Sequence, residues 1–415
     1  IRDRGGGGGG VYYTLTITVT PSSGGTTNPS PGTYQYQQGT TVQVTAIPNT
    51  NYVFWEWILD GGIESTNNPI TITMDKDHTL EAVFEPWLTG WKYRREITVI
   101  ERTGTTLTNY QLLIELNSTN FDFSKAKSDG SDIRITDSDK VTLLNYWIES
   151  WDPVNKKAKI WVKVTLPGGT TKKIYLYHGN PSASYDPSHH GLTKVMEQLP
   201  ARDGNNYKIQ YQEWKMPGRY FQAIGRAMGW HADDRSWRYT LPFAFPYYSR
   251  SYTRVYVCSN GFLDFTNSYA DWSSTVGELL SRRMIAPFWA DLRTDRGLGS
   301  DIYIASSYSD EYGSGVYIRW YTVFYYYSGR QNFAVVLYRN GLIRFDYGSI
   351  RGSSFTDGTQ VVGVSFGDRT HYIISSYDYS RLRRYPSNYN SLMFWPRKVA
   401  STEPQVVIGG EESPP

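Results

Sequence analysis

The sequence predicts a multidomain protein built almost entirely of β-strands. Aromatic residues make up 16% of the 415 residues, with 35 Tyr and 14 Trp, and aromatic side chains suit pleated, half-buried sheets. The 38 Gly and 20 Pro divide the chain into short runs, which is typical of strands joined by turns. Apolar residues alternate with polar ones along most of these runs, whereas helix-period segments are scarce. Such strands, apolar on one face and polar on the other, indicate antiparallel β-sandwiches.

The strands and turns can be placed in order along the chain. Alternation predicts a strand that contains Leu15, Ile17 and Val19, and further strands at "TTVQVTAI", at "AKIWVKVTL" and at "KKIYLYHG". "FAVVLYRNGLIRFDYG" is predicted to be a hairpin with a type I′ turn at Asn340–Gly341, because that turn needs positive φ at both central residues. "STVGELLSRRM" at 274–284 is the best candidate for a helix, of one or two turns.

Changes in local composition divide the chain into three units with an N-terminal arm and a C-terminal tail. A length of 415 residues allows two to four domains of roughly 100–200 residues each. Proline and serine gather at the expected joints, as they do at domain boundaries. The predicted segments are a Gly-rich arm at 1–10, units at 11–86, 87–186 and 187–385, and a tail at 386–415.

The first unit carries the segments "PGTYQY", "GTTVQVTA" and "MDKDHTLEAVF", with Trp57 between the last two. In these segments it resembles the divergent internalin B-type repeat of bacterial and archaeal surface proteins. That resemblance implies a small β-grasp-like or immunoglobulin-like spacer module. Glu56 stands where the family usually has Gly, so the local turn is expected to differ.

The second unit contains the blocks "DIRITDSD", "YWIESW", "IWVKV" and "IYLYHGNP" in order. It is similar to an uncharacterised domain of archaeal and bacterial exoproteins, which implies a lectin-like jelly roll. The third unit contains "SNGFLDF", "APFWADL" and "LYRNGLIRFDYG". It resembles the nidogen-type extracellular β domain, which implies a further β-sandwich. Together the three resemblances imply an extracellular or cell-surface location and attachment modules.

The charge and cysteine content exclude several classes of function. The 42 basic and 39 acidic residues give a net charge of +3, which offers no electrostatic argument for a nucleic-acid partner. No apolar run approaches the roughly 18 residues that a membrane span needs. The single cysteine, Cys258, forbids an intrachain disulfide and is expected to be a buried core thiol. The chain starts at Ile1 instead of Met, which is typical of a processed or trimmed terminus.

No motif in the sequence supports catalysis. The six histidines form no HExxH pair, and "SHHG" at 188–191 is expected to be a solvated loop. No GxSxG elbow, P-loop or dinucleotide fingerprint occurs in a strand–turn–helix context. We therefore expect a non-enzymatic protein without a cofactor, calcium excepted.

Clusters of aspartate residues make calcium a candidate ligand. "DGSDIRITDSD" supplies Asp129, Asp132, Asp137 and Asp139, and "ADLRTD" supplies Asp291 and Asp295. Calcium takes six to eight oxygen ligands, which clustered Asp with nearby carbonyls can provide. Asp is also a common turn residue because its side chain bonds its own backbone, so a structural or solvated role is the main alternative. A carboxylate pair for glycoside hydrolysis is the remaining alternative.

Aromatic side chains offer a second kind of site, for surface glycans. Trp147 and Trp151, together with Tyr325, Tyr326 and Tyr327, could stack on sugar rings. The alternative is that these rings fill a thin sandwich core or form cross-strand pairs.

One sequon, "NST", marks Asn117 as a surface acceptor for glycosylation.

The termini suggest self-assembly. Six glycines at the N-terminus cannot stabilise themselves, and a short apolar strand near the C-terminus belongs to no recognisable domain. Either segment could complete its backbone hydrogen bonds in a neighbouring copy, and an open head-to-tail contact produces a filament. We therefore predict a structural subunit of an extracellular filament, and the alternative is a monomeric secreted or cell-wall carbohydrate-binding accessory protein. The predicted inter-subunit residues are Gly5, Gly6, Gly7, Gly8, Gly9, Gly10, Val406, Val407 and Ile408.

Overall fold

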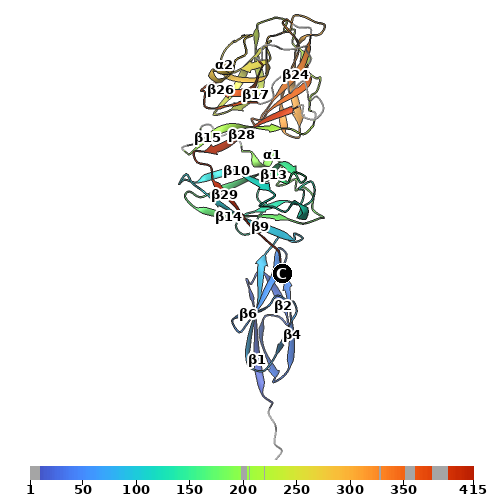
Figure 1. Cartoon of the computed structure of the whole chain (residues 1–415), viewed down its shortest axis with the longest axis vertical. Coiled ribbons are helices and arrows are strands. Elements are labelled where there is room, and N and C mark those ends of the chain that lie inside the picture. The colour runs from blue at the N-terminus through green and yellow to red at the C-terminus, as the bar shows by residue number, and fades with distance from the viewer. Residues whose placement is uncertain are drawn as a thin grey trace, which may run out of the picture. The chain divides into compact units, whose positions relative to one another are not determined.

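The chain folds into two compact units of almost pure β-structure, seen in a computed structural model (Figure 1). Unit 1 comprises residues 1–101, 112–191 and 405–415, and unit 2 comprises residues 102–111 and 192–404. The multidomain all-β fold predicted from the sequence is confirmed. The structure describes residues 10–197, 203–204, 206–218, 220–326, 329–350, 360–375 and 391–415.

The first part of unit 1 is the segment that resembles the repeat module. Strands β1 and β8 are parallel neighbours at the centre of a five-stranded sheet with the order β3-β1-β8-β5-β6, and β2-β4-β7 form a second sheet. Alternation explains the packing, because Leu15 and Ile17 of β1 and Val44 of β4 are buried while the intervening Thr and Gln side chains face outward or lie half-buried. The register of β5 against β8 shifts between Phe54 and Glu56, so the strand is irregular where the sequence departs from the family pattern. The strands are β1 (Tyr12–Thr20), β2 (Gly25–Asn28), β3 (Gly32–Gln37), β4 (Thr41–Pro48), β5 (Tyr52–Leu59), β6 (Gly62–Ser65), β7 (Ile70–Thr73) and β8 (His78–Pro86).

The second part of unit 1 contains two antiparallel sheets. One has the order β10-β13-β12, and the other has the order β11-β14-β9-β29. The predicted inward face of β13 is buried, because Ile160, Val162, Val164 and Leu166 alternate with more exposed residues at most positions. Residues 107–111 of β10 are grouped with unit 2. The elements are β9 (Tyr93–Ile100), β10 (Leu107–Asn117), the 3₁₀ turn η1 (Phe123–Lys125), β11 (Arg134–Thr136), β12 (Tyr146–Asp152), β13 (Lys157–Leu166), β14 (Thr171–His178) and β29 (Gln405–Glu412).

Unit 2 is a large sandwich of two antiparallel sheets. The eight-stranded sheet has the order β15-β28-β25-β24-β23-β22-β16, with β21 beside β23, and the six-stranded sheet has the order β17-β18-β19-β20-β26-β27. The predicted short helix is present as α2, capped by the Thr275 side chain. The elements are α1 (Leu192–Val195), β15 (Tyr207–Lys215), β16 (Arg226–Ala227), β17 (Ser236–Tyr247), β18 (Arg250–Cys258), β19 (Phe262–Asp264), α2 (Val276–Ser281), β20 (Arg283–Trp289), β21 (Leu292–Arg293), β22 (Asp301–Asp310), β23 (Gly313–Phe324), β24 (Arg330–Tyr338), β25 (Ile343–Ile350), β26 (Val361–Phe366), β27 (Tyr372–Ile374) and β28 (Ser391–Ala400).

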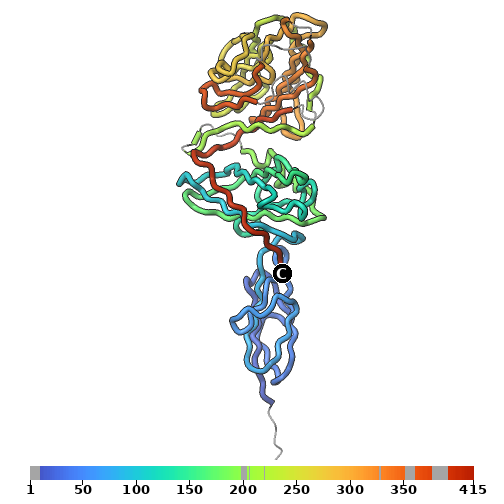
Figure 2. Tube along the Cα trace, in the orientation of Figure 1, coloured from blue at the N-terminus to red at the C-terminus, as the bar shows by residue number. Residues whose placement is uncertain are grey.

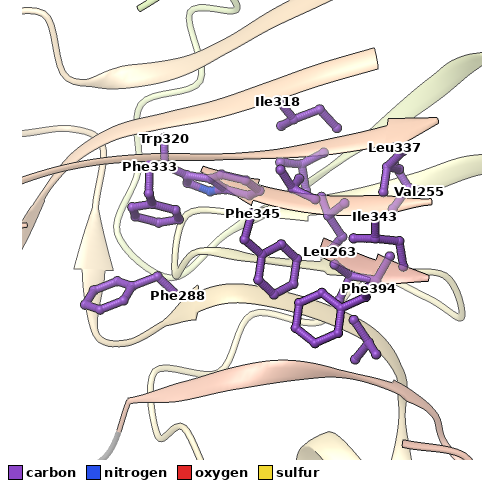
Figure 3. Packing of buried hydrophobic residues seen from close by; sticks show 14 of the residues in the cluster. Val255, Leu263, Phe288, Ile318, Trp320, Phe333, Leu337, Ile343, Phe345 and Phe394 are labelled. Atoms are coloured by element: carbon purple, nitrogen blue, oxygen red, sulfur yellow. The ribbon is translucent and has the colours of Figure 1, made fainter. Parts of the chain in front are cut away.

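The core of unit 2 draws large side chains from both of its sheets (Figure 3). Val255 and Leu263 come from the six-stranded sheet, and they join Trp320 and Phe333 of the eight-stranded sheet in one buried cluster. The Trp320 and Phe333 rings are stacked, with centroids 5.4 Å apart. Much of the unusual aromatic content therefore fills this core, as expected for paired rings on adjacent strands.

The predicted C-terminal tail is not a separate element. Strand β28 lies between β15 and β25 in unit 2, and the next strand, β29, pairs antiparallel with β9 in unit 1. Figure 2 shows the last, dark red part of the chain beside the light blue part that contains β9. The second domain of unit 1 is therefore discontinuous, since its edge strand comes from the end of the chain.

The hairpin predicted around Asn340–Gly341 is present, but its turn is not type I′. Strands β24 and β25 pair from Leu337 to Ile343, and the connection closes with a hydrogen bond from the Tyr338 N–H to the Leu342 carbonyl. Gly341 has a φ of 89°, whereas Asn340 does not have a positive φ. A longer loop with one left-handed residue replaces the two-residue turn.

Candidate functional site

The aspartates predicted to bind calcium are engaged in hydrogen bonds or an ion pair within unit 1. Asp132 is buried, and its carboxylate accepts hydrogen bonds from the backbone N–H groups of Lys127 at 3.0 Å and Gly179 at 2.7 Å. Asp129 is exposed and accepts from the Ser131 N–H at 3.0 Å. Both carboxylates therefore hold turns, which is the ordinary role of Asp in such a loop.

The other two predicted ligands are engaged in the same way. Asp137 forms an ion pair with Lys172, with 2.8 Å between Oδ1 and Nζ. Asp139 accepts from the N–H groups of Val141 at 3.1 Å and Thr142 at 2.8 Å. Over the described ranges, these four aspartates do not form a group whose oxygens converge on one point. Backbone donors and one lysine bind these carboxylates, and the calcium prediction at these positions stays a prediction.

The predicted aromatic residues divide into core and surface. Trp147 is buried, and Trp151 packs against Phe121 and Phe123 with ring centroids 5.8 and 5.1 Å away. Trp147 is therefore a core residue, and Trp151 is half-buried against two phenylalanine rings. Tyr325 and Tyr326, in contrast, are 36% and 78% exposed. Tyr327 lies outside the described residues.

Three other aspartates converge in unit 2. Carboxylate oxygens of Asp233, Asp234 and Asp291 lie within 4.8 Å of one another, and these residues line a cavity of about 240 Å³. They come from two loops, one before β17 and one between β20 and β21. Together with Trp272, Tyr325 and Tyr326, which complete the lining, they form what we call the acidic–aromatic pocket.

A buried asparagine fixes the geometry of this pocket. Asn260 is fully buried, and its amide donates to Asp234 Oδ1 at 2.8 Å and to the Asp271 carbonyl at 3.1 Å. Its own side-chain oxygen accepts from the Leu292 N–H at 2.9 Å. One side chain therefore joins the loop of Asp234 to the strand that follows Asp291.

Asp233 lies partly buried beside another carboxylate. Burial, together with the neighbouring charge of Asp234, raises the pKa of Asp233 above its usual value. Its Oδ1 atom is buried without a hydrogen-bond partner, while its Oδ2 atom lies 3.7 Å from an Arg293 nitrogen. Arg293 is bound more closely by Asp295, at 2.6 Å, so it compensates Asp233 only in part.

Exposed rings form the rim of the pocket. Trp272 is 57% exposed, and the Tyr325 and Tyr326 rings meet edge to face with centroids 4.6 Å apart. The Tyr325 N–H donates to the Asp291 carbonyl at 3.2 Å, which anchors the aromatic segment to the acidic loop. Large apolar side chains exposed beside oriented polar groups are typical of a binding surface. The sequence singled out Tyr325, Tyr326 and Asp291, but it gave no signal that joined them to Trp272 or to the Asp233–Asp234 pair.

Three family models match separate segments of the chain. Residues 15–87 match the divergent InlB B-repeat domain, and residues 129–215 match a domain of unknown function, DUF2341. Residues 210–391 match the NIDO-related family. No curated protein matches the chain.

The acidic–aromatic pocket lies entirely within the NIDO-related segment. Two of the blocks that suggested this family build it, since "SNGFLDF" contributes Asn260 and "APFWADL" contributes Asp291. The NIDO-related and InlB B-repeat segments are extracellular-type β domains. Among the described residues, no helix is long and apolar enough to cross a membrane.

The remaining predicted site residues lie elsewhere. Asn117 is exposed at the end of β10, and its side-chain oxygen accepts from the Thr119 N–H of its own sequon at 2.9 Å. Cys258 is buried in unit 2, as predicted, and burial raises the pKa of its thiol. Gly10 lies two residues before the first strand, which begins at Tyr12, and residues 5–9 lie outside the described residues.

The C-terminal residues predicted to pair with a neighbouring copy pair within their own chain. Val406, Val407 and Ile408 lie opposite Val99, Thr98 and Ile97 of β9. The expectation that this apolar segment lacks a partner in its own molecule is wrong. The partner strand lies about 300 positions earlier in the chain, so no local signal could reveal it.

Proposed function

We propose that this protein is a non-catalytic, extracellular attachment protein that binds glycans at the acidic–aromatic pocket. The observation that supports this most directly is the meeting of exposed Trp272 and Tyr326 with three carboxylates around one cavity. Aromatic faces offer apolar area to the C–H face of a sugar ring, and carboxylates accept hydrogen bonds from its hydroxyl groups.

The pocket favours binding over catalysis because its acidic groups are held by structure. The Asp234 side chain is fixed by Asn260, and that of Asp233 lies beside Arg293. The pocket is also shallow enough to leave Tyr326 largely in solvent, whereas acid–base chemistry gains from a water-excluded site. A rigid, open, ring-lined surface suits recognition of a sugar chain.

The experiment is a glycan-array screen of the full chain, followed by titration of the best ligand. Tyr326→Ala and Trp272→Ala should each weaken binding about tenfold, which corresponds to roughly 1.4 kcal/mol of lost stacking. Tyr372→Ala is the matched control, because Tyr372 is also an exposed tyrosine of unit 2 but does not line the pocket. Binding that survives both substitutions would refute the proposal.

The same titration decides whether a cation takes part. The three carboxylates are oxygen ligands of the kind that calcium prefers. If sugar hydroxyls bind these oxygens directly, a chelator leaves the affinity unchanged. Loss of binding in chelator, restored by added calcium, would show instead that the glycan is held through a metal ion.

The filament prediction stays a prediction, and it has lost one of its two supports. Strand β29 already completes a sheet of its own chain, so this segment needs no second copy. The glycine arm at residues 1–9 lies outside the described residues. Electron microscopy of purified full-length protein, with a variant lacking residues 1–10, still tests that function.

A further inference from the structure

A second cavity adjoins the acidic–aromatic pocket, because Tyr325 and Tyr326 line both. This second cavity has a volume of about 400 Å³. Two arginines, Arg296 and Arg330, belong to its lining, and the described residues that line it include no carboxylate. We call it the basic cavity. The two tyrosines, which we call the tyrosine wall, are thus shared by a cavity lined with aspartates and a cavity lined with arginines.

Both arginines are available to a ligand. Arg330 donates from Nη1 to the Leu298 carbonyl at 3.0 Å, and its guanidinium lies 4.3 Å from the Tyr321 ring centroid. These contacts hold the group in place and leave further donors on a guanidinium, which has five N–H groups. Arg296 is exposed.

The nearest acidic neighbour in sequence is paired with another arginine. Asp295 binds Arg293 through both carboxylate oxygens, at 2.6 and 2.7 Å. That pairing is the main cause that keeps the pKa of Asp295 below its usual value, and the charge of Arg296 adds to it. Among the described residues, neither Arg296 nor Arg330 forms an ion pair within 4.0 Å.

We propose that the basic cavity binds the carboxylate or sulfate group of an acidic sugar. This proposal rests on the glycan-binding function above and specifies its ligand. A sugar chain that stacks on the tyrosine wall would place hydroxyl groups against the aspartates and a charged substituent of a neighbouring sugar against the arginines. Guanidinium groups suit this role because they form paired hydrogen bonds with planar carboxylates and with sulfate-like oxyanions.

The test titrates the full chain with polygalacturonate, dextran sulfate and neutral dextran, alongside an array that contains neutral and acidic glycans. Acidic glycans should bind more tightly than neutral ones, and binding should weaken as salt is raised. An Arg296→Gln, Arg330→Gln double variant should lose at least about tenfold in affinity for them. Arg254→Gln, an exposed arginine of β18, is the control and should change nothing.

A single Arg296→Gln variant shows whether misfolding explains the loss, because this exposed side chain forms no hydrogen bond or close ion pair among the described residues. This variant should fold and lose part of the affinity. Binding of polygalacturonate alone, or of dextran sulfate alone, supports the proposal and identifies the charged group. Neutral glycans that bind through Tyr326, with arginine variants unaffected, would overturn this proposal but leave the glycan-binding function intact. If no glycan binds at all, both proposals fail.

Discussion

Replacing Asn260 with alanine should destabilise unit 2 and disorder the acidic–aromatic pocket together. The variant removes the acceptor of the buried Leu292 N–H and the donor of Asp234 Oδ1. An unsatisfied buried N–H costs about 1–3 kcal/mol, and the lost bond to the exposed Asp234 carboxylate adds about 1 kcal/mol. The donor to the Asp271 carbonyl is lost as well. We expect the free energy of unfolding of unit 2 to fall by about 3 kcal/mol.

The assay is hydrogen exchange in increasing urea, followed on peptides from β18 to β21, because the fluorescence of 14 tryptophans would mix signals from both units. Asn267→Ala is the control, since Asn267 is exposed and accepts one bond from Arg282. That control should change stability by less than about 0.5 kcal/mol. A loss below about 1 kcal/mol for Asn260→Ala would refute the view that this side chain organises the pocket.

Three further predictions concern other parts of the chain. The Thr79 N–H, with Lys76 and His78, lowers the pKa of Asp60 to about 2. The stability that the ionised Asp60 contributes to folding is therefore complete above about pH 4 and is lost as the pH falls toward 2. Thermal unfolding measured against pH should show this dependence, and Asp60→Asn should abolish it. The thiol of Cys258 should react with Ellman's reagent only after denaturation, and rapid labelling of the native protein would contradict its burial. Deleting residues 405–415 should expose the edge of β9, because β29 pairs with that edge. Hydrogen exchange of β9 should then rise, and light scattering should detect association of the variant through the open edge. Unchanged protection of β9 would contradict the pairing with β29.

The local parts of the fold follow from the sequence. Alternation located β1, β4 and β13, because an antiparallel strand with one buried face repeats every two residues. The helix at 276–281 was also predicted. The path of the C-terminal strand was not, because β29 pairs with β9 across a separation that reaches 318 residues between Arg94 and Glu412. Alternation describes one strand and carries no information about its partner.

The candidate pocket was predicted only in fragments. Counting aspartates favoured Asp129 and its neighbours, but those carboxylates bond to nearby backbone groups of unit 1 or, for Asp137, to Lys172. The pocket arises where segments around residues 233, 272, 291 and 325 converge, and Asn260 is the residue that ties two of them together. Convergence of distant loops is a property of the sandwich and is invisible in any one segment.

Because β29 is synthesised last, its pairing with β9 constrains the order in which this protein folds during synthesis. Until residue 412 has been synthesised and released, strand β9 lacks its neighbour on one side, and Arg94 lacks the Glu412 carboxylate that binds it at 2.6 Å. The whole NIDO-related segment must emerge before that edge can close. A ribosome that stalls within the segment would therefore leave a nascent chain with an open strand edge, ready to pair with another unfinished copy.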